Sequence, residues 1–198
     1  MDASELLNRY QAGERDFRGV DLSTEFLMGF LNEADFSEAN LTEAVIDRTE
    51  FNLANLSQAN LQRTELCKVY LLKANLSGVN LSQAKLTEVH LEYANLRGAN
   101  LSRAILIQSY LVGANLSEAN LTKVMCGSAN MSGADLSRAN LSGANLSGEN
   151  FSGANLAHAK LIGCDLSQAN LTGAILDGVA LDEVDLTGAV MPDGTIHD

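Results

Sequence analysis

The chain has 198 residues, no tryptophan, one proline and a formal net charge of −12. This charge disfavours direct binding to nucleic acid or to anionic membranes, because both need clustered Lys and Arg. The N-terminal stretch lacks a basic segment followed by an apolar run, and no stretch of about 18 apolar residues occurs, so we expect a cytoplasmic protein without a membrane segment. Cys67, Cys126 and Cys164 share no ligand spacing, so the sequence predicts no disulfide framework, metal site or cofactor.

The first 13 residues predict a short helix. Asp2 or Ser4 can accept hydrogen bonds from amides of the first turn, and Gly13 can end the helix. Leu6, Leu7 and Tyr10 would then form one apolar stripe. We expect residues 1–13 to cap whatever structure follows.

An apolar residue recurs at every fifth position from Phe26 to Met191 without an insertion or deletion. A small side chain, usually Ala, lies two positions before each such centre; Asn or Asp usually lies between them, and Ser or Thr often follows. The unit is therefore A(N/D)L(S/T)X. Two earlier centres, Phe17 and Leu22, precede this series, and the four-residue step from Leu22 to Phe26 predicts a slip in register near the start.

A period of five matches neither a helix nor a strand. The chain must therefore turn at every repeat, with the centre and the small residue pointing inward and the other three positions outward. Stacked coils would place like residues about 4.8 Å apart along the axis. Stretches such as ANLSQANL and ADLSRANLSGANL resemble the pentapeptide-repeat protein family over nearly the whole chain.

This resemblance implies an all-β solenoid, a right-handed quadrilateral β-helix with about 20 residues per coil and about nine coils. We expect the cap at residues 1–13, the β-helix at residues 14–191, and a turn and tail at residues 192–198. Glu149 stands at a small inward position. Its carboxylate either swings out to water, the interpretation that we favour, or is buried and hydrogen-bonded with a raised pKa.

A period of about 20 residues sorts the outward positions onto four sides. Two sides carry mostly Asn before the centre and Ser or Thr after it, whereas the other two carry aromatic and aliphatic residues in the middle of the chain. Contiguous exposed apolar groups are uncommon on soluble monomers, so these residues are the candidate partner-binding surface. They are Tyr70, Leu72, His90, Tyr93, Ile105, Ile107, Tyr110 and Val112.

No serine or cysteine combines with a histidine and an acid in a way that predicts catalysis. The sequence therefore favours a non-enzymatic binding or scaffold module, a monomer or weak homodimer, whose protein partner it does not identify. The resemblance also suggests an alternative, a DNA-mimicking inhibitor of a type II topoisomerase (gyrase). That function needs acidic rows along the rod, but residues 51–173 hold 7 acidic and 9 basic groups and the acidity lies at the two ends.

Overall fold

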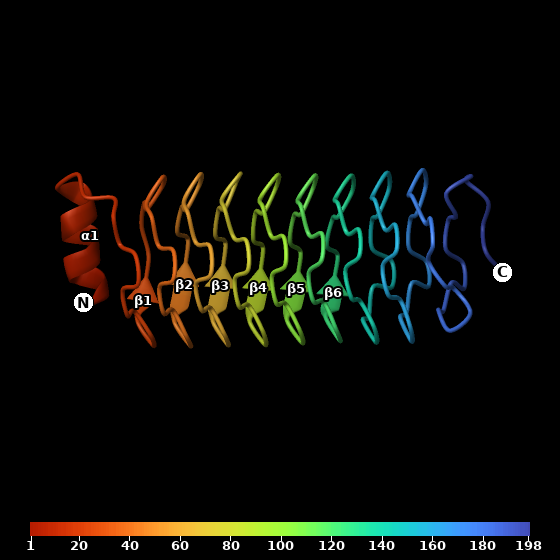
Figure 1. Cartoon of the computed structure of the whole chain (residues 1–198), viewed down its shortest axis with the longest axis horizontal. Helices are drawn as coiled ribbons and strands as arrows, with labels where there is room; N and C mark the ends of the chain where they lie inside the picture. Colours follow the sequence, from red (N-terminus) through yellow and green to blue (C-terminus); the bar gives the residue numbers. More distant parts are fainter.

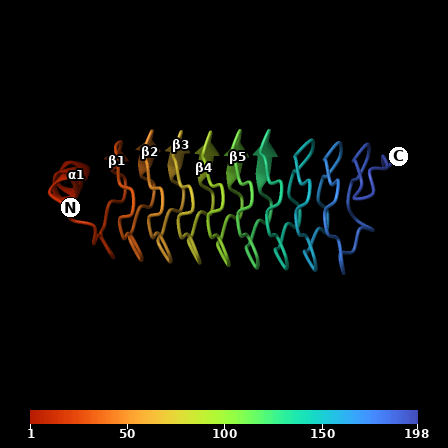
Figure 2. The ribbon, with the colours of Figure 1, turned by 90° about the horizontal axis from the view of Figure 1, so that it is seen from above.

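A computed structural model describes residues 1–198 and shows one straight rod of stacked coils with a helix across its N-terminal end (Figure 1, Figure 2). The strands are parallel, each from a successive coil, in the order β1-β2-β3-β4-β5-β6. The elements are α1 (Ala3–Gln11), β1 (Phe26–Leu27), β2 (Val45–Asp47), β3 (Glu65–Cys67), β4 (Lys85–Thr87), β5 (Ile105–Ile107) and β6 (Met125–Gly127). The expected fold class, a β-helix with a short N-terminal helix, is confirmed.

Repeat centres one coil apart stack directly on each other. Leu66 of β3 pairs with Leu86 of β4, and Leu86 pairs with Leu106 of β5. All three leucines are buried, as are the small residues that precede the centres, such as Ala84 and Ala104. One continuous apolar core therefore runs along the axis of the rod.

We number the four sides by their centres. Side 1 is centred on Leu56, Leu76 and Leu96; side 2 on Leu61, Leu81 and Leu101; side 3 on Leu66, Leu86 and Leu106; side 4 on Leu71, Leu91 and Leu111. Isolated parallel bridges join successive coils on sides 1, 2 and 4, whereas strands β1 to β6 all lie on side 3.

The last position of the repeat accepts many different side chains, but its backbone conformation is fixed. Gln58, Glu38 and Tyr93 adopt φ angles of 60°, 61° and 57°, and Gly78 adopts 66° at the equivalent position. This left-handed conformation turns the chain from one side to the next, and glycine adopts it without steric cost. The frequent glycine at this position of the repeat is thereby explained.

Asparagine ladders close the outer surface of sides 1 and 2. The Asn75 Nδ2 donates to Asn55 Oδ1 at 3.0 Å, and Asn80 Nδ2 donates to Asn60 Oδ1 at 3.0 Å. The Asn75 Oδ1 also accepts the Ser77 amide at 3.2 Å. The repeat consensus thus satisfies its polar groups within the rod.

The slip in register is real but lies five residues later than the sequence suggested. Phe26 is 55% exposed, whereas Leu27 is fully buried and continues the series from Leu22; the four-residue step runs from Leu27 to Leu31. Gly29 lies inside this step with a φ of 151°, and a Cβ there would lie 3.2 Å from Leu7 Cδ2 of α1. Phe26 is therefore not a repeat centre, and Leu7 of the helix packs at Gly29, where the coil is one residue short.

The strands account for fewer coils than the sequence predicts, which is about nine. Strands β1 to β6 span five steps of the stack, because side 3 forms no strand beyond Gly127. Isolated bridges continue the 20-residue register on side 1, from Asp35↔Asn55 to Asn155↔Ile175. At the C-terminal end, Ile196 pairs antiparallel with Val190, so the tail folds back over the last coil.

Candidate protein-binding face

Three aromatic rings stack on side 4, and we call Tyr70, His90 and Tyr110 the aromatic ladder. The ring centroids of Tyr70 and His90 are 4.8 Å apart with planes at 11°, and those of His90 and Tyr110 are 4.7 Å apart at 16°. These residues occupy the position that Asn130 and Asn150 hold further along the same side. The parallel register thus turns residues 20 apart in sequence into one stack.

Aliphatic and aromatic side chains flank this ladder. Leu72 is 42% exposed and Tyr93 is 60% exposed, while Val112 is half-buried. The Tyr93 ring lies over Gly113, where a Cβ would come within 2.7 Å of the ring. The glycine at position 113 therefore lets the tyrosine lie flat along the rod.

A shallow groove of about 380 Å³ runs between the ladder and Tyr93. Two polar residues that the sequence did not single out contribute to it. The Glu92 Oε1 lies 2.9 Å from His90 Nδ1, and the Asn52 Oδ1 accepts the Leu72 amide at 3.0 Å. Glu92 stands where serine is usual in the repeat, a departure that could have identified it. The groove is lined by Asn52, Tyr70, Leu72, His90, Glu92 and Tyr93.

Neither of the two candidates on side 3, Ile105 and Ile107, lines this groove, but Ile107 lies near the ladder. Ile107, 43% exposed, ends β5 at the corner that leads through Gln108 to Tyr110 of the ladder. Ile105, at the start of β5, is half-buried and lies at the opposite edge of side 3, between its register partners Lys85 and Met125. We call Tyr70, Leu72, His90, Tyr93, Ile107, Tyr110 and Val112 the corner patch.

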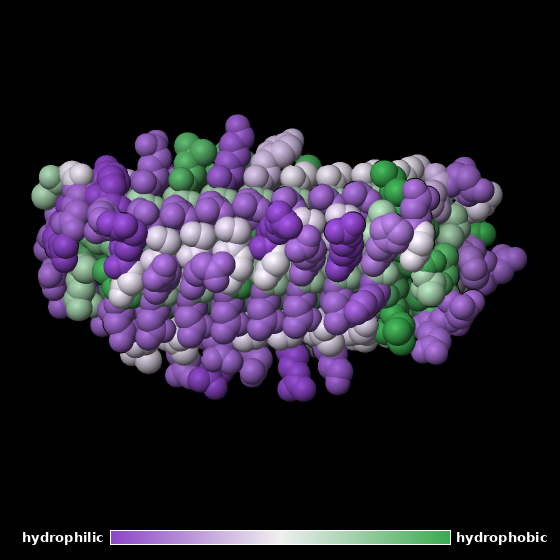
Figure 3. All heavy atoms as spheres, in the orientation of Figure 1, coloured by the Kyte–Doolittle hydropathy of each residue, from purple (hydrophilic) through white to green (hydrophobic).

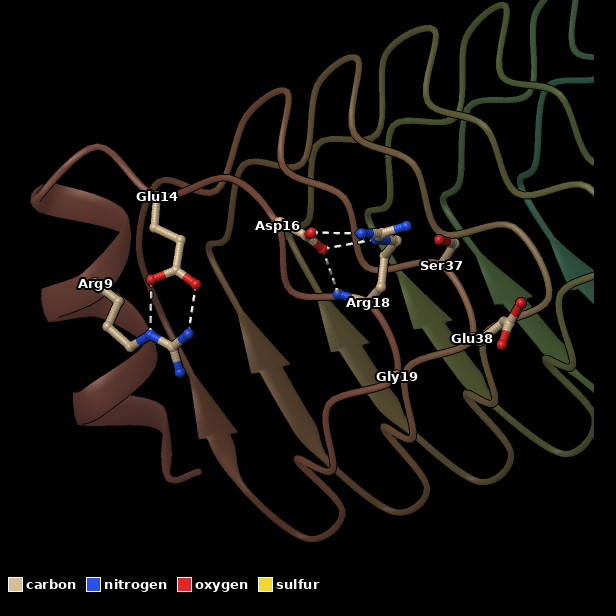
Figure 4. A pocket seen from close by; sticks show the side chains of 7 residues that line it. All are labelled: Arg9, Glu14, Asp16, Arg18, Gly19, Ser37 and Glu38. Atoms are coloured by element: carbon tan, nitrogen blue, oxygen red, sulfur yellow. Dashed lines mark hydrogen bonds and ion pairs between the residues drawn. The ribbon is translucent and has the colours of Figure 1, made fainter.

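A larger depression, of about 550 Å³, lies at the N-terminal end, where α1 meets the first coils (Figure 4). The guanidinium group of Arg9 is paired with Glu14, and the Arg18 Nη2 lies 2.6 Å from Asp16 Oδ2. Hydrogen bonding to Arg18 lowers the pKa of Asp16 to about 2. Because each cation is already held by a carboxylate, this depression offers a ligand no free positive charge.

The structure gathers no group of three or more His, Cys, Asp or Glu side chains able to hold a metal ion. Its helix is nine residues long and polar on most positions, and no helix could cross a membrane.

Comparisons with known proteins agree with the repeat register. The family model described as pentapeptide repeats matches eight copies, in residues 30–58, 49–87, 84–123, 126–148 and 150–188. The crystal structure of HetL, a pentapeptide repeat protein involved in heterocyst differentiation regulation from the cyanobacterium Nostoc sp. strain PCC 7120, is similar over 100% of both chains, with 36% identity and a TM-score of 0.63.

Full-length QnrB1, a plasmid-mediated fluoroquinolone resistance protein, shares the fold at 22% identity and a TM-score of 0.68, covering 90% of this chain and 92% of QnrB1. No curated protein matches the sequence significantly. The match of the family model along most of the chain and the full-length similarity to HetL lead to one conclusion: the chain belongs to the pentapeptide-repeat protein family.

Proposed function

We propose that the protein is a non-enzymatic binding module that recognises a protein partner through the corner patch. The observation that carries this proposal is the stack of Tyr70, His90 and Tyr110, whose two tyrosines are more than 40% exposed. Aromatic side chains with an apolar face and a polar tip are enriched where proteins bind each other.

The contrast between the sides supports the assignment. Sides 1 and 2 present asparagine ladders whose amides are bonded to each other, as from Asn95 to Asn75, so few polar or apolar groups are left for a partner. On side 4 the same position holds Phe30 and Glu50, then the three stacked rings, and it becomes asparagine only from Asn130 on. The ring stack itself is confined to the middle coils, as a local binding site would be.

Charge argues against gyrase inhibition by DNA mimicry. Such mimicry needs negative charge along the rod, yet the 7 acidic residues of the segment 51–173 are outnumbered by 9 basic ones. Several of these carboxylates are paired, including Glu65 with Lys85 and Glu118 with Arg97. The likeness to QnrB1, at 22% identity, concerns the fold alone.

The experiment places a photo-crosslinking phenylalanine analogue at one of two outward turn positions and recovers cross-linked proteins from an extract of the native cells. Tyr93 lies in the corner patch, and Gln83 lies at the equivalent turn position of side 2. The proposal expects one specific protein cross-linked from position 93 and not from position 83. Equal recovery from both positions would contradict it.

A triple variant with Tyr70, His90 and Tyr110 replaced by Asn tests the same surface without a cross-linker. It restores the ladder residue of the repeat, so the loss of ring stacking is offset by amide hydrogen bonds and the melting temperature should stay within a few degrees. The matched control replaces Ser57, Ser77 and Ser137 of side 1 by Asn. The partner should be lost from the first variant and retained by the second; retention by both would place recognition elsewhere.

A further inference from the structure

The C-terminal end of the rod is covered on only half of its cross-section. In the preceding coil Leu156 and Leu161 are each 1% exposed, whereas their equivalents in the last coil, Leu176 and Leu181, are only half-buried. Exposed apolar side chains adjoin them, with Ile162 at 57% and Ile175 at 46%. Figure 3 shows hydrophobic atoms gathered at this end of the rod, in contrast to the polar rows along its middle.

The backbone of sides 1 and 2 is also unpaired at this end. The Leu156 amide donates to Ile175 O at 2.8 Å, and the Gly163 amide donates to Glu183 O at 2.9 Å. The equivalent amides in the last coil, those of Leu176 and Glu183, have no acceptor in the chain. The end therefore has an open β edge, which is a template for another extended strand.

Sides 3 and 4 of the same end are closed by the tail. The His197 amide donates to Ala189 O at 2.9 Å, and the Gly188 amide donates to His197 O at 2.7 Å. Leu186 and Ala189 beneath it are at most 4% exposed. The open edge is thus a defined half of the end, from Ile175 to Val184.

The open half is ringed by unpaired negative charge. Residues 174–198 contain six acidic and no basic residues, and every ion pair of the structure lies between residues 5 and 118. Asp177, Asp182 and Glu183 are exposed at the rim, and none of them has a cationic partner. This charge disfavours a second copy as the occupant, because both ends of the rod are acidic and would repel each other.

We propose that this open half binds an extended cationic segment of another protein by strand addition. The partner's backbone would pair with the amide of Leu176 on side 1, turn at the level of Gly178 as the coil does, and pair with the amide of Glu183 at the end of side 2. Its apolar side chains would cover Leu176 and Leu181. Its Lys or Arg side chains would meet Asp177, Asp182 and Glu183. The site is separate from the corner patch, so each can fail without the other.

The probe is a dye-labelled nine-residue peptide of alternating Lys and Val, whose binding to the full chain is measured by fluorescence anisotropy at low salt. Asp182→Asn with Glu183→Gln should weaken binding about five- to tenfold, since two charge pairs at the rim are lost. The matched control, Glu33→Gln with Glu38→Gln, removes two exposed carboxylates at the other end of the rod. It should bind within a factor of about two of the parent.

Two further arms separate strand addition from simple charge attraction. A peptide of alternating Lys and Pro keeps the charge but lacks the alternate backbone amides, so it should bind much more weakly. Hydrogen exchange, followed by NMR, should slow at the amides of Leu176 and Glu183 when the Lys-Val peptide is added, and not at Leu96 in the core. Equal binding of the two peptides, equal weakening by both double substitutions, or unchanged exchange at Leu176 and Glu183 would overturn the proposal.

Discussion

The carboxyl group of Glu149 lies against the backbone amide of Ala129, one coil earlier in the stack. Sequence reasoning favoured an outward carboxylate, and this was wrong: Glu149 is 2% exposed, and its Oε2 has no hydrogen-bond partner. The reason is that the backbone hydrogen bonding between coils on side 3 changes after β6. The Gln108 amide donates to Gly127 O at 2.7 Å in the coil before, but the Ser128 amide finds no carbonyl ahead of it. The carboxyl group of Glu149 fills this seam.

We predict that Glu149→Gln stabilises the protein at neutral pH and not at acidic pH. Burial raises the pKa of Glu149, and the amides of Ala129 and Ser128 oppose this only in part. Between the pKa of the unfolded chain, near 4.5, and the raised folded value, the unfolded state loses its proton first, so the parent loses stability as pH rises. The difference in unfolding free energy between variant and parent should grow from near zero at pH 4 toward pH 7.

The control for this prediction is Glu149→Ala, which restores the small residue of the repeat but leaves the Ser128 and Ala129 amides without a side-chain acceptor. It should be less stable than Glu149→Gln by about 1–3 kcal/mol, the cost of unsatisfied buried polar groups. Denaturant unfolding at several pH values measures both. A stability difference between parent and Glu149→Gln that does not vary with pH would contradict burial of a titrating carboxyl group.

An aspartate should destabilise the protein far more in the interior of the rod than on its outer surface. Leu96 is fully buried, and the neighbouring Arg97 is exposed and paired with Glu118 at 3.0 Å. Leu96→Asp places an unpaired carboxylate in the core and should cost at least about 3 kcal/mol or prevent folding. Arg97→Asp should change stability by about 1 kcal/mol or less, because an exposed ion pair contributes little. Thermal melting distinguishes them, and equal melting temperatures would refute the β-helix.

Much of this fold follows from the sequence because its repeat length is constant. A centre every five residues fixes which side chains point inward, and Leu71, Leu91 and Leu111 are all buried as expected. The same register places Tyr70, His90 and Tyr110, which are 20 residues apart, on one side of the rod, where they stack, although their function stays a prediction.

Three features could not be predicted from the repeat pattern. Each lies where the backbone departs from the regular coil and depends on contacts made there. The pattern placed the register slip at Phe26, since either Phe26 or Leu27 can serve as a centre. The structure buries Leu27 instead, and Leu7 of α1 packs against Gly29 inside the short step. Burial of Glu149 depends on the end of strand formation after β6, which no residue of the consensus specifies. The open half of the C-terminal end depends on how far the tail reaches, up to the pairing of Ile196 with Val190.

The three thiols should react at very different rates. Burial raises the pKa of Cys164 to about 11, and its Sγ donates to Leu141 O at 2.7 Å. Burial also raises the pKa of Cys126, which occupies a repeat centre on β6, whereas Cys67 ends β3 on the outer surface, half-buried. Thiolate is the reactive form, so one thiol should react quickly with Ellman's reagent at pH 8 and two only slowly. Cys67→Ser should abolish the fast phase; its persistence would show that another thiol is accessible.

The last prediction concerns helix α1 as the cap of the first coil. Asp2 accepts the Glu5 amide at 2.8 Å and begins the helix, Leu6 is fully buried, and the Tyr10 hydroxyl donates to Asn32 O at 3.0 Å. Removing residues 1–13 would expose the apolar interior and the unpaired β edge of the first coil, and such edges associate with other chains. The truncated rod should therefore show a mass that rises with concentration in light scattering, whereas the full chain should not.

A point substitution tests the same role without shortening the chain. Leu6→Asp should detach α1 from the first coil, because a charge cannot be buried there without a partner. The exposed substitution Gln11→Asp, at the end of the same helix, is the matched control and should leave the mass unchanged. If the truncated rod and Leu6→Asp both stay monomeric at every concentration, the edge of the first coil does not need a cover, and α1 has no capping role.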